Sequence, residues 1–535
     1  MNLVDALALY GLTAGYSQEQ VDEVFSRLVR ECTDNGEHHK VADILAARVA
    51  LISAIEDQPE PEPEPEPQEE KESDLAIKYL DSNSKNVFIT GAGGTGKSFL
   101  LKALVQHWSN RNLAVVAFTG VAALNVSGET AHKFFKLPPH GALSFIDWKT
   151  KVNAKMRTKY EALDILILDE VSMASADLLD SINNLLKAAR RSEEPFGGVR
   201  VVLFGDPWQL PPVIDQGDKV AYEKMVEKYP MGCWFFESEG YQAGDFEVIE
   251  LVTNHRVQDA DTSGSAFLKA LSVLRKGEER LDALNLFNSR VGQHPLMPNA
   301  ITIVSTNEEV AMINEDYMSK IQKPLMSFDI RVQILDNSLI GKEIDFDRLT
   351  PAKKLLLKEG AQVMFIKNDD QGNQVVNGKR EVRWVNGTTG VIEGFSDDGE
   401  TVFVRVKETV YPVGRSVWDD VQHEVVETVL PNGAIDAAIR PKTRIQYSQF
   451  PLKLAWALTI HKSQGQTYDA MYFDPSRIFA EGQTYVALSR SRSLEGIGLI
   501  NPVTDNGVKV SEAVRQFMNI VKVKHLIEQD GSSSN

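Results

Sequence analysis

The residues best suited to chemistry stand at 91–98, directly after the apolar run 87–90. Glycines at this spacing let backbone N–H groups gather around phosphate oxygens, and the lysine that follows can reach the β- and γ-phosphates. The last residue is a serine, whose hydroxyl can hold Mg²⁺. We therefore predict a nucleoside triphosphate site, for ATP, formed by Gly91, Gly93, Gly94, Thr95, Gly96, Lys97 and Ser98.

A second candidate element is the apolar run 165–168, which ends in Asp169 and Glu170. Asp169 can complete the Mg²⁺ shell, and Glu170 can orient and deprotonate the attacking water. An apolar strand that ends in two acids is common and usually structural. Its place about 70 residues after a complete phosphate loop favours a role in hydrolysis.

A third element follows the strand-like run 199–204, in a loop that three prolines stiffen. Gln209 in this loop is placed to sense the γ-phosphate. Trp208 beside it has two interpretations, either a ring that stacks on a nucleic-acid base or the core tryptophan of a structural turn. Spacing alone does not choose between these two.

Two arginines far apart in the chain, Arg256 and Arg490, are candidates for the positive charge that stabilises phosphoryl transfer. If they closed on ATP from a second α/β lobe, they would couple hydrolysis to lobe closure. Most arginines are simply solvated, so residue type alone does not support this role.

Length and charge limit the protein that must position these residues. A chain of 535 residues predicts three or four domains. The net charge of −18 argues against nucleic acid, but residues 56–74 hold ten acids and one lysine, about half of that charge. Any basic groove would therefore be local. Two isolated cysteines, no secretory start and no long apolar run predict a cytoplasmic protein, bacterial or phage-encoded, without a membrane partner.

The first 74 residues divide into two parts. Apolar residues recur at helical spacing through 1–55, which predicts a small helical accessory module with a possible protein partner. Alternating proline and glutamate then predict an extended acidic linker over 56–74. The linker is interpreted as a passive tether, with an acidic tail that competes with DNA for a basic groove as the alternative.

From residue 75 onward, continuous apolar strands alternate with helices. The runs 87–90, 114–118, 165–168, 199–204 and 301–304 predict an α/β fold of parallel sheets covered on both faces. Between about 361 and 450, short strand-like pieces joined by Gly, Asn and Asp turns predict a small β-barrel insertion. The α/β pattern resumes near 452.

Several further motifs occur in a consistent order. They are the stretches 119–125, 128–134, 177–198, 360–364 with 385–390, 458–467 and 487–490. Together with the phosphate loop, they resemble the petite-integration-frequency (PIF) type of DNA helicase, in the RecD-like 5′-to-3′ branch of superfamily 1. The resemblance covers about residues 85–500.

The resemblance implies a motor with two RecA-like lobes. The first lobe would span 75–265 with a wedge-like insertion at 134–160, and the second would span 266–500 with the β-barrel insertion at 367–450. A C-terminal helix and tail would occupy 501–535. The family has a glutamine-bearing, adenine-reading motif before the phosphate loop, whereas residues 74–80 contain no glutamine.

The resemblance also implies residue roles. Catalysis would use Lys97, Glu170, Gln209, Arg256 and Arg490. Nucleotide contacts would add Gly465, and Mg²⁺ would lie at Ser98 and Asp169. Single-stranded DNA would be contacted by Thr119, Gly120, His132, Phe134, Trp208, Thr306, His461, Lys462 and Ser463.

The function expected from the resemblance is ATP-dependent unwinding of duplex DNA by 5′-to-3′ movement on a single strand, in replication, repair or recombination. Forked duplex DNA would be a second partner. Two alternatives remain open: an ATP-gated DNA-binding or assembly switch that does not unwind, and a motor subunit of a larger nuclease or defence complex.

Overall fold

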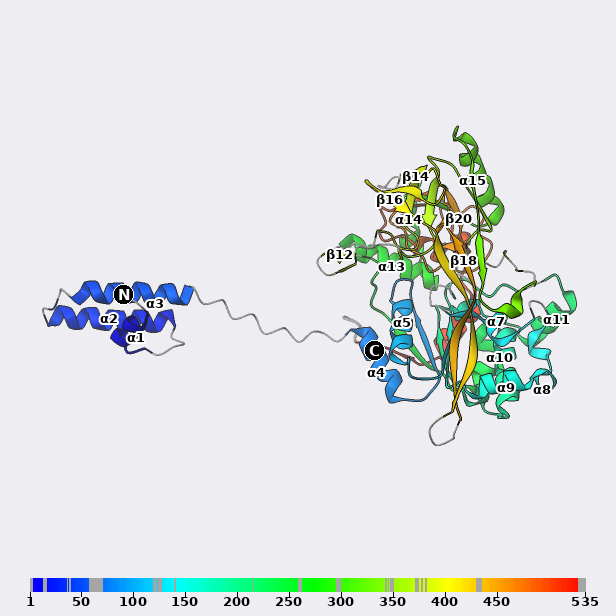
Figure 1. The fold of residues 1–535 in the computed structure, drawn as a ribbon, viewed down its shortest axis with the longest axis horizontal. Coiled ribbons are helices and arrows are strands. Elements are labelled where there is room, and N and C mark those ends of the chain that lie inside the picture. Colours follow the sequence, from blue (N-terminus) through cyan, green and yellow to red (C-terminus); the bar gives the residue numbers. More distant parts are fainter. Residues whose placement is uncertain are drawn as a thin grey trace. The chain divides into compact units, whose positions relative to one another are not determined.

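The computed structural model describes residues 3–12, 17–35, 37, 40–56, 71–118, 123, 128–138, 141–214, 216–257, 262–294, 300–341, 344, 346, 351–370, 375–376, 379–380, 383–429 and 435–527. The chain divides into two compact units, Met1–Lys71 and Glu72–Asn535 (Figure 1). Within the described ranges, no helix has the length and apolar character to cross a membrane.

The N-terminal unit is helical, as its periodicity predicts. It contains α1 (Leu3–Tyr10), α2 (Gln18–Asp34) and α3 (Val41–Glu56). Ser17 caps α2 in a reciprocal capping box with Gln20, and a small core that includes Val21, Ile44 and Leu51 joins the helices. Most of the predicted linker lies outside the described residues. Its last three residues, 72–74, are not linker, because α4 (Glu72–Ser82) begins there.

The first lobe of the second unit is built on a seven-stranded parallel sheet, in the order β23-β6-β1-β5-β4-β2-β3. Its strands are β1 (Val87–Gly91), β2 (Leu113–Ala117), β3 (Glu129–Thr130), β4 (Ile165–Asp169), β5 (Arg200–Phe204), β6 (Glu247–Leu251) and β23 (Val523–Lys524). The four apolar runs predicted as strands in this part of the chain are therefore confirmed.

Helices cover both faces of this sheet, which explains why its strands are apolar throughout. In β1, Phe88 packs into one core with α10 (Ala176–Arg190), while Val87 and Ile89 pack into the opposite core with α4 and α5 (Lys97–His107). The region predicted as a wedge, 134–160, begins at the end of α7 (Ala131–Phe135) and includes α8 (Trp148–Lys151) and most of α9 (Ala154–Glu161). Its Trp148 and Tyr160 are buried in the first-lobe core, and a wedge function stays a prediction.

The C-terminal residues differ from the expected helix and tail. They do form a helix, α18 (Glu512–Ile520), but β23 then pairs in parallel with β6 of the first lobe. Val514 of α18 is fully buried in the first-lobe core. The chain therefore returns from the second lobe to complete the first, a contact that a short strand of mixed composition does not reveal in sequence.

The second lobe contains a four-stranded parallel sheet, in the order β20-β7-β21-β22. Its strands are β7 (Ile301–Val304), β20 (Ala457–Thr459), β21 (Met471–Phe473) and β22 (Ile497–Leu499). Its core includes residues of α13 (Thr262–Lys276), α14 (Leu281–Asn288) and α17 (Gln483–Leu488). The strand predicted at 301–304 is confirmed as β7.

The predicted barrel region is a small β-domain with a core of its own, which includes Phe328, Trp384 and Phe450. Five antiparallel strands are ordered β16-β15-β14-β11-β19. They are β11 (Gln362–Phe365), β14 (Thr389–Phe395), β15 (Val402–Val406), β16 (Thr409–Val413) and β19 (Leu452–Leu454). The domain begins before the predicted residue 367. A pair of short strands, β8 (Met326–Asp329) and β10 (Lys354–Leu357), contributes to its core. Each has only four residues, too few for a clear strand pattern in the sequence.

A long hairpin leaves this β-domain and reaches the first lobe. It consists of β17 (Ser416–Val429) and β18 (Ile435–Gln449), with β9 (Arg331–Ile334) paired along β18. In Figure 1 the hairpin runs past α7 and α9, and the Asp420 carboxylate forms an ion pair with Lys133 of α7.

Candidate active site and nucleic-acid interface

Four loops of the first lobe meet at one edge of its sheet. They follow β1, β4, β5 and β6, which are parallel neighbours or near neighbours, so their carboxyl ends point the same way. This edge is where open α/β sheets bind their ligands. It therefore brings the phosphate loop, Asp169 with Glu170, Gln209 and Arg256 into one region.

The phosphate loop has the backbone that its glycines allow. Gly94 and Gly96 have φ of +96° and +82°, and Gly96 precedes the first residue of α5. The Lys97 ammonium lies within the loop and donates to the carbonyls of Gly91 (2.6 Å) and Ala92 (3.0 Å). Burial lowers the pKa of Lys97 to about 8, although Asp206 and Glu170 oppose that shift. The end of a helix and a buried cation thus face the same loop.

The two acids after β4 lie among charged and polar groups of both lobes. Burial, with the neighbouring Glu170 carboxylate, raises the pKa of Asp169 to about 7. Burial also raises the pKa of Glu170, while Lys97 and Arg490 act in the opposite direction. Glu170 has φ of +54°, a left-handed conformation that is costly for a non-glycine residue and concentrates at functional sites.

Both predicted arginines stand against the phosphate loop. A Cβ atom built on Gly93 would lie 3.0 Å from Nη1 of Arg256 and 3.3 Å from Nη2 of Arg490. Arg490 comes from the second lobe just after α17 and is 1% exposed. Arg256 comes from the first lobe, yet it donates to the Ser489 carbonyl (2.6 Å) and to Thr467 Oγ1 (3.0 Å) of the second lobe. The lobes are therefore joined through the groups expected to sense phosphate.

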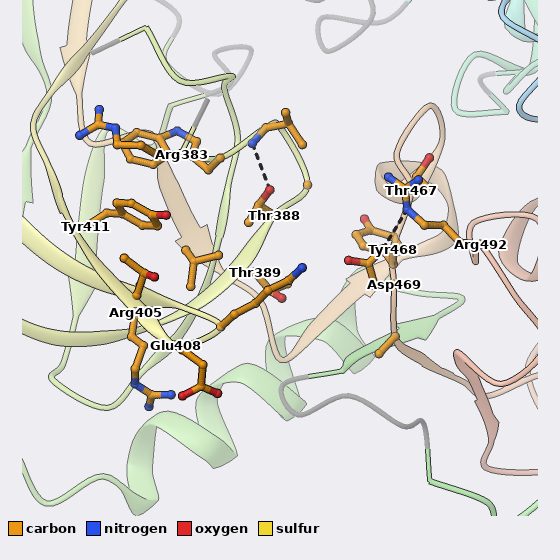
Figure 2. A pocket seen from close by; sticks show the side chains of 17 residues that line it. Arg383, Thr388, Thr389, Arg405, Glu408, Tyr411, Thr467, Tyr468, Asp469 and Arg492 are labelled. Carbon is orange, nitrogen blue, oxygen red and sulfur yellow. Dashed lines mark hydrogen bonds and ion pairs between the residues drawn. The ribbon is translucent and has the colours of Figure 1, made fainter. Parts of the chain in front are cut away.

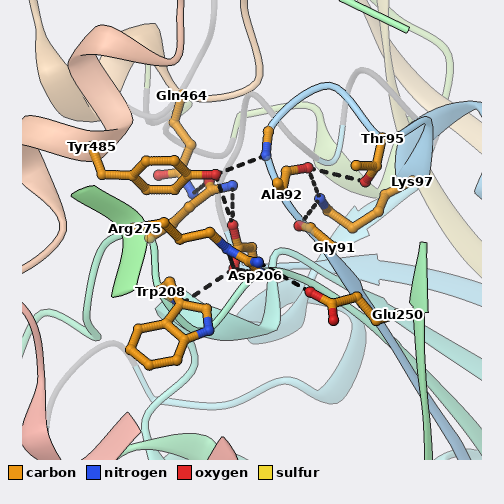
Figure 3. A network of polar contacts seen from close by, with 12 residues as sticks. Gly91, Ala92, Thr95, Lys97, Asp206, Trp208, Glu250, Arg275, Gln464 and Tyr485 are labelled. Carbon is orange, nitrogen blue, oxygen red and sulfur yellow. Dashed lines mark hydrogen bonds and ion pairs between the residues drawn. The ribbon is translucent and has the colours of Figure 1, made fainter. Parts of the chain in front are cut away.

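A network that the sequence did not predict surrounds these residues (Figure 3). Arg275 of α13 forms ion pairs with Asp206 (2.9 Å) and Glu250 (3.0 Å). The Tyr485 hydroxyl accepts from the backbone N–H of Gly93 (2.9 Å) and donates to Asp206 (3.4 Å). Asp206 lies two residues after β5, at the start of the proline-rich loop, and this position in the sequence could have identified it. Arg275 stands in an ordinary helix and offered none.

Gln464 completes the link between the lobes. Its side-chain amide donates to the Glu170 carboxylate (3.1 Å) and to Oε1 of Gln209 (3.3 Å), whose own amide donates to Asp206 (3.2 Å). Gln464 lay inside a recognised motif but was not singled out. Gly465, predicted to contact nucleotide, follows it with φ of +76° and an exposed backbone.

The predicted metal ligands have suitable chemistry. Ser98 is the second residue of α5, and Asp169 is the last residue of β4, so a hydroxyl and a carboxylate end at the same sheet edge. Hydroxyl and carboxylate oxygens suit Mg²⁺, which is usually held by one or two protein groups together with substrate phosphates. The described residues contain no group of three or more His, Cys, Asp or Glu that could hold a metal without such phosphates.

The predicted DNA contacts are less uniform, and three of them are buried. Phe134 is 0% exposed and packs with Phe135 and Tyr160, and Trp208 is 9% exposed in the same first-lobe core. Both rings are buried, which favours the structural interpretation of Trp208, and contact of either ring with a base stays a prediction. Ser463 is also 0% exposed and donates its hydroxyl to the Ile460 carbonyl (2.7 Å).

The other predicted contacts have different surroundings. Lys462 is exposed in α16 (Ile460–Ser463), and His461 beside it is half-buried, which lowers the pKa of its imidazole. His132 is half-buried in α7. Thr306 caps α15 (Asn307–Lys320), accepting from the Glu309 backbone N–H (3.3 Å). Thr119 and Gly120 lie outside the described residues.

A cleft of about 790 Å³ separates the β-domain from the second lobe (Figure 2). Arg405, Tyr411 and Thr388 line one side, and Asp469 and Arg492 line the other. Thr467, which accepts the hydrogen bond from Arg256, is part of this lining. The β-domain thus faces the loop whose Thr467 contacts Arg256.

Comparison with known proteins gives one consistent result. A family model described as PIF1-like helicase matches residues 68–281. ATP-dependent DNA helicase Pif1 of Bdellovibrio bacteriovorus is 30% identical over 431 residues, covering 78% of this chain and 84% of that protein. Human ATP-dependent DNA helicase PIF1 is 30% identical over 419 residues, covering 78% of this chain but 58% of that protein.

Solved structures agree over the same region. The crystal structure of Pif1 from Bacteroides sp. in complex with ADP-AlF4 has a TM-score of 0.71 at 30% identity, covering 84% of this chain and 96% of that one. The structure of Bacteroides Pif1 bound to single-stranded DNA has a TM-score of 0.57 at 30% identity, with the same coverage. A further structure, with a TM-score of 0.57 at 29% identity and the same coverage, concerns unwinding of forked double-stranded DNA by two coordinating Pif1 helicases.

Proposed function

The chain belongs to the PIF1-like helicase family, and on that premise we propose that it is an ATP-dependent DNA helicase that moves 5′-to-3′ on single-stranded DNA. The observation that carries this proposal is the meeting of both lobes at Gly93, where Arg256 and Arg490 stand against the phosphate loop. An ATP site closed by two lobes can convert hydrolysis into relative lobe movement.

In the proposed reaction, the backbone amides of the phosphate loop and Lys97 bind the β- and γ-phosphates of ATP. Glu170 orients the attacking water and accepts its proton, and burial, which raises its pKa, suits a general base. Arg256, Arg490 and Gln209 stabilise the charge on the transferred phosphoryl group. Ser98 and Asp169 would hold Mg²⁺, which neutralises the phosphate charge when bound.

Loss of the γ-phosphate changes the contacts of groups that already join the lobes. Gln464 contacts both Glu170 and Gln209, and Arg256 contacts Ser489, so a change at the phosphate alters contacts on both sides. We propose that alternate closure and opening of the lobes moves the strand past Lys462 and His461. Phosphate contacts of this kind make DNA affinity fall as salt rises.

We further propose that residues 1–55 recruit a protein partner, since they form a compact unit of their own. A reducing, cytoplasmic location is proposed because Cys32 and Cys233 are both buried free thiols. We propose a role for the protein in replication, repair or recombination, because these processes need duplex DNA to be unwound.

The test is the ATPase rate of the full chain with and without single-stranded DNA, together with unwinding of duplexes that carry a 5′ or a 3′ tail. The proposal expects strong stimulation by DNA and opening of the 5′-tailed duplex alone. Opening of the 3′-tailed duplex alone would reverse the polarity. Hydrolysis indifferent to DNA, with neither duplex opened, would favour the ATP-gated switch.

A further inference from the structure

Glu72 occupies a position that its sequence context does not suggest. It follows the acidic run of 56–71, yet it is the first residue of α4 and is 7% exposed. Helix α4 itself is fixed to the first lobe, because Ala76 and Leu80 are fully buried in the core beneath β1 and β6. A buried carboxylate on a fixed helix needs partners to offset its desolvation.

The partners of Glu72 are two consecutive backbone N–H groups. The Glu72 carboxylate accepts from Val252 (3.0 Å) and from Thr253 (3.0 Å), which follow the last residue of β6. Hydrogen bonds to an ionised acceptor are shorter and stronger than neutral ones. One carboxylate therefore holds the first two residues of the segment that leaves the sheet toward the ATP site.

That segment, residues 252–257, is then tied to the phosphate loop. The Asn254 side-chain amide donates to the Gly93 carbonyl (3.2 Å), and its Oδ1 accepts from the backbone of Arg256 (2.9 Å). The backbone N–H of His255 donates to the Gly94 carbonyl (2.9 Å). Arg256 then reaches Ser489 and Thr467 of the second lobe. We call residues 252–257 the arginine strap.

We propose that Glu72 is a positioning residue for ATP hydrolysis, which fixes the root of the arginine strap so that Arg256 meets the transferred phosphoryl group. This inference rests on the proposed function of Arg256. When a group that stabilises a transition state is displaced slightly, the rate of the chemical step falls much more than the affinity for the substrate. Glu72 touches neither ATP nor the phosphate loop, so its effect must pass through the strap.

The experiment compares Glu72→Ala and Glu72→Gln in the full chain. In the glutamine variant, one amide oxygen can accept one N–H, while the amide NH₂ group faces the other, so part of the restraint is kept. We expect kcat for ATP to fall roughly tenfold in Glu72→Ala and less in Glu72→Gln, with KM changed less than kcat. Ser82→Ala is the control, since Ser82 is exposed on the same helix and lies outside residues 74–80.

Two measurements separate positioning from a merely structural role. Affinity for ADP should be nearly unchanged in Glu72→Ala, whereas affinity for ADP with aluminium fluoride, a mimic of the transition state, should fall with kcat. In an Arg256→Ala background, adding Glu72→Ala should have little further effect on kcat, because the strap no longer carries the arginine.

Full kcat in a folded Glu72→Ala variant, or equal loss of ADP and ADP–aluminium fluoride affinity, would overturn the proposal. An undiminished Glu72→Ala effect in the Arg256→Ala background would also overturn it. If Glu72→Ala does not fold, the same criteria apply to Glu72→Gln. Absence of DNA stimulation in the unchanged protein would instead contradict the helicase function, and the ADP–aluminium fluoride comparison would still decide the role of Glu72.

Discussion

The ATP edge and the predicted strand-binding face of this protein are organised in opposite ways. At the ATP edge, residues from both lobes are buried and joined by hydrogen bonds, as Gln464 joins Glu170 to Gln209. Among the residues predicted for the strand-binding face, Phe134 and Trp208 lie in the first-lobe core and Ser463 is buried, whereas Lys462 is exposed.

The difference follows from what each region must do. Phosphoryl transfer needs charges held in place in a water-excluded site, and a buried polar network is stable only when its members are all satisfied. A strand that moves past the protein needs contacts that form and break, which suits exposed groups. Substitutions at the ATP edge should therefore have large, specific effects, and substitutions on the strand-binding face should have small, salt-dependent ones.

The largest effect is expected at Lys97. Lys97→Ala should abolish ATP hydrolysis, because it removes the cation buried in the phosphate loop. The measurement is steady-state ATPase rate with saturating single-stranded DNA. Lys102→Ala, on the next turn of α5 and exposed, is the control. Substantial turnover by Lys97→Ala would contradict the assignment of this loop.

Glu170→Gln should slow hydrolysis by about 10²–10⁴-fold while ATP remains bound, since the amide cannot accept the proton of the attacking water. Single-turnover hydrolysis and equilibrium binding of ATP measure the two effects separately. If ATP binding were lost together with hydrolysis, Glu170 would have a structural role in the site and would not be the general base.

Arg275→Met should lower the free energy of unfolding by about 3–5 kcal/mol, because it leaves the buried Asp206 carboxylate without its cation. Arg280→Met removes a partly exposed pair with Asp505 and should cost at most about 1 kcal/mol. Denaturant titration compares the two variants. An equal loss in the free energy of unfolding for the two variants would contradict the expectation that the buried ion pair matters more than the exposed one.

The pH dependence of kcat/KM for ATP should be bell-shaped. Asp169, with a pKa of about 7, must lose its proton to serve as a metal ligand, so kcat/KM rises through that value. Lys97, with a pKa of about 8, loses its charge above that value, so kcat/KM then falls. Affinity for single-stranded DNA, measured over the same pH range without nucleotide, should not show this bell-shaped pH dependence. A flat kcat/KM profile between pH 6 and 9 would refute the prediction.

The smallest effect is expected at Lys462. Lys462→Ala should weaken DNA binding only a few-fold and reduce the salt slope of log affinity by about 1, as expected for one phosphate contact. DNA titrations at several salt concentrations measure this slope. Lys228→Ala is a suitable comparison, because that lysine is already paired with Asp180 and Glu239. The same slope for Lys462→Ala and the unchanged protein would remove Lys462 from the interface.

Several elements followed directly from the sequence. The strands β1, β2, β4, β5 and β7 were confirmed because each is an apolar run buried on both faces. The β-domain was recognised by its turns, but its first strands were missed because β8 and β10 are only four residues long. The burial of Phe134 and Trp208 was not predicted, because an aromatic residue in a DNA-contact motif and one in a core have the same local sequence.

By itself, the sequence determined the phosphate loop, the acids after β4, the family and the alternation of strands and helices, because these depend on neighbours along the chain. Only the tertiary structure decided that Arg275 pairs with Asp206, that Glu72 holds the arginine strap and that Gln464 reaches Glu170. Those partners lie 69, 180 and 294 positions apart. Such pairings depend on which loops end at the same sheet edge, and folding alone brings those ends together.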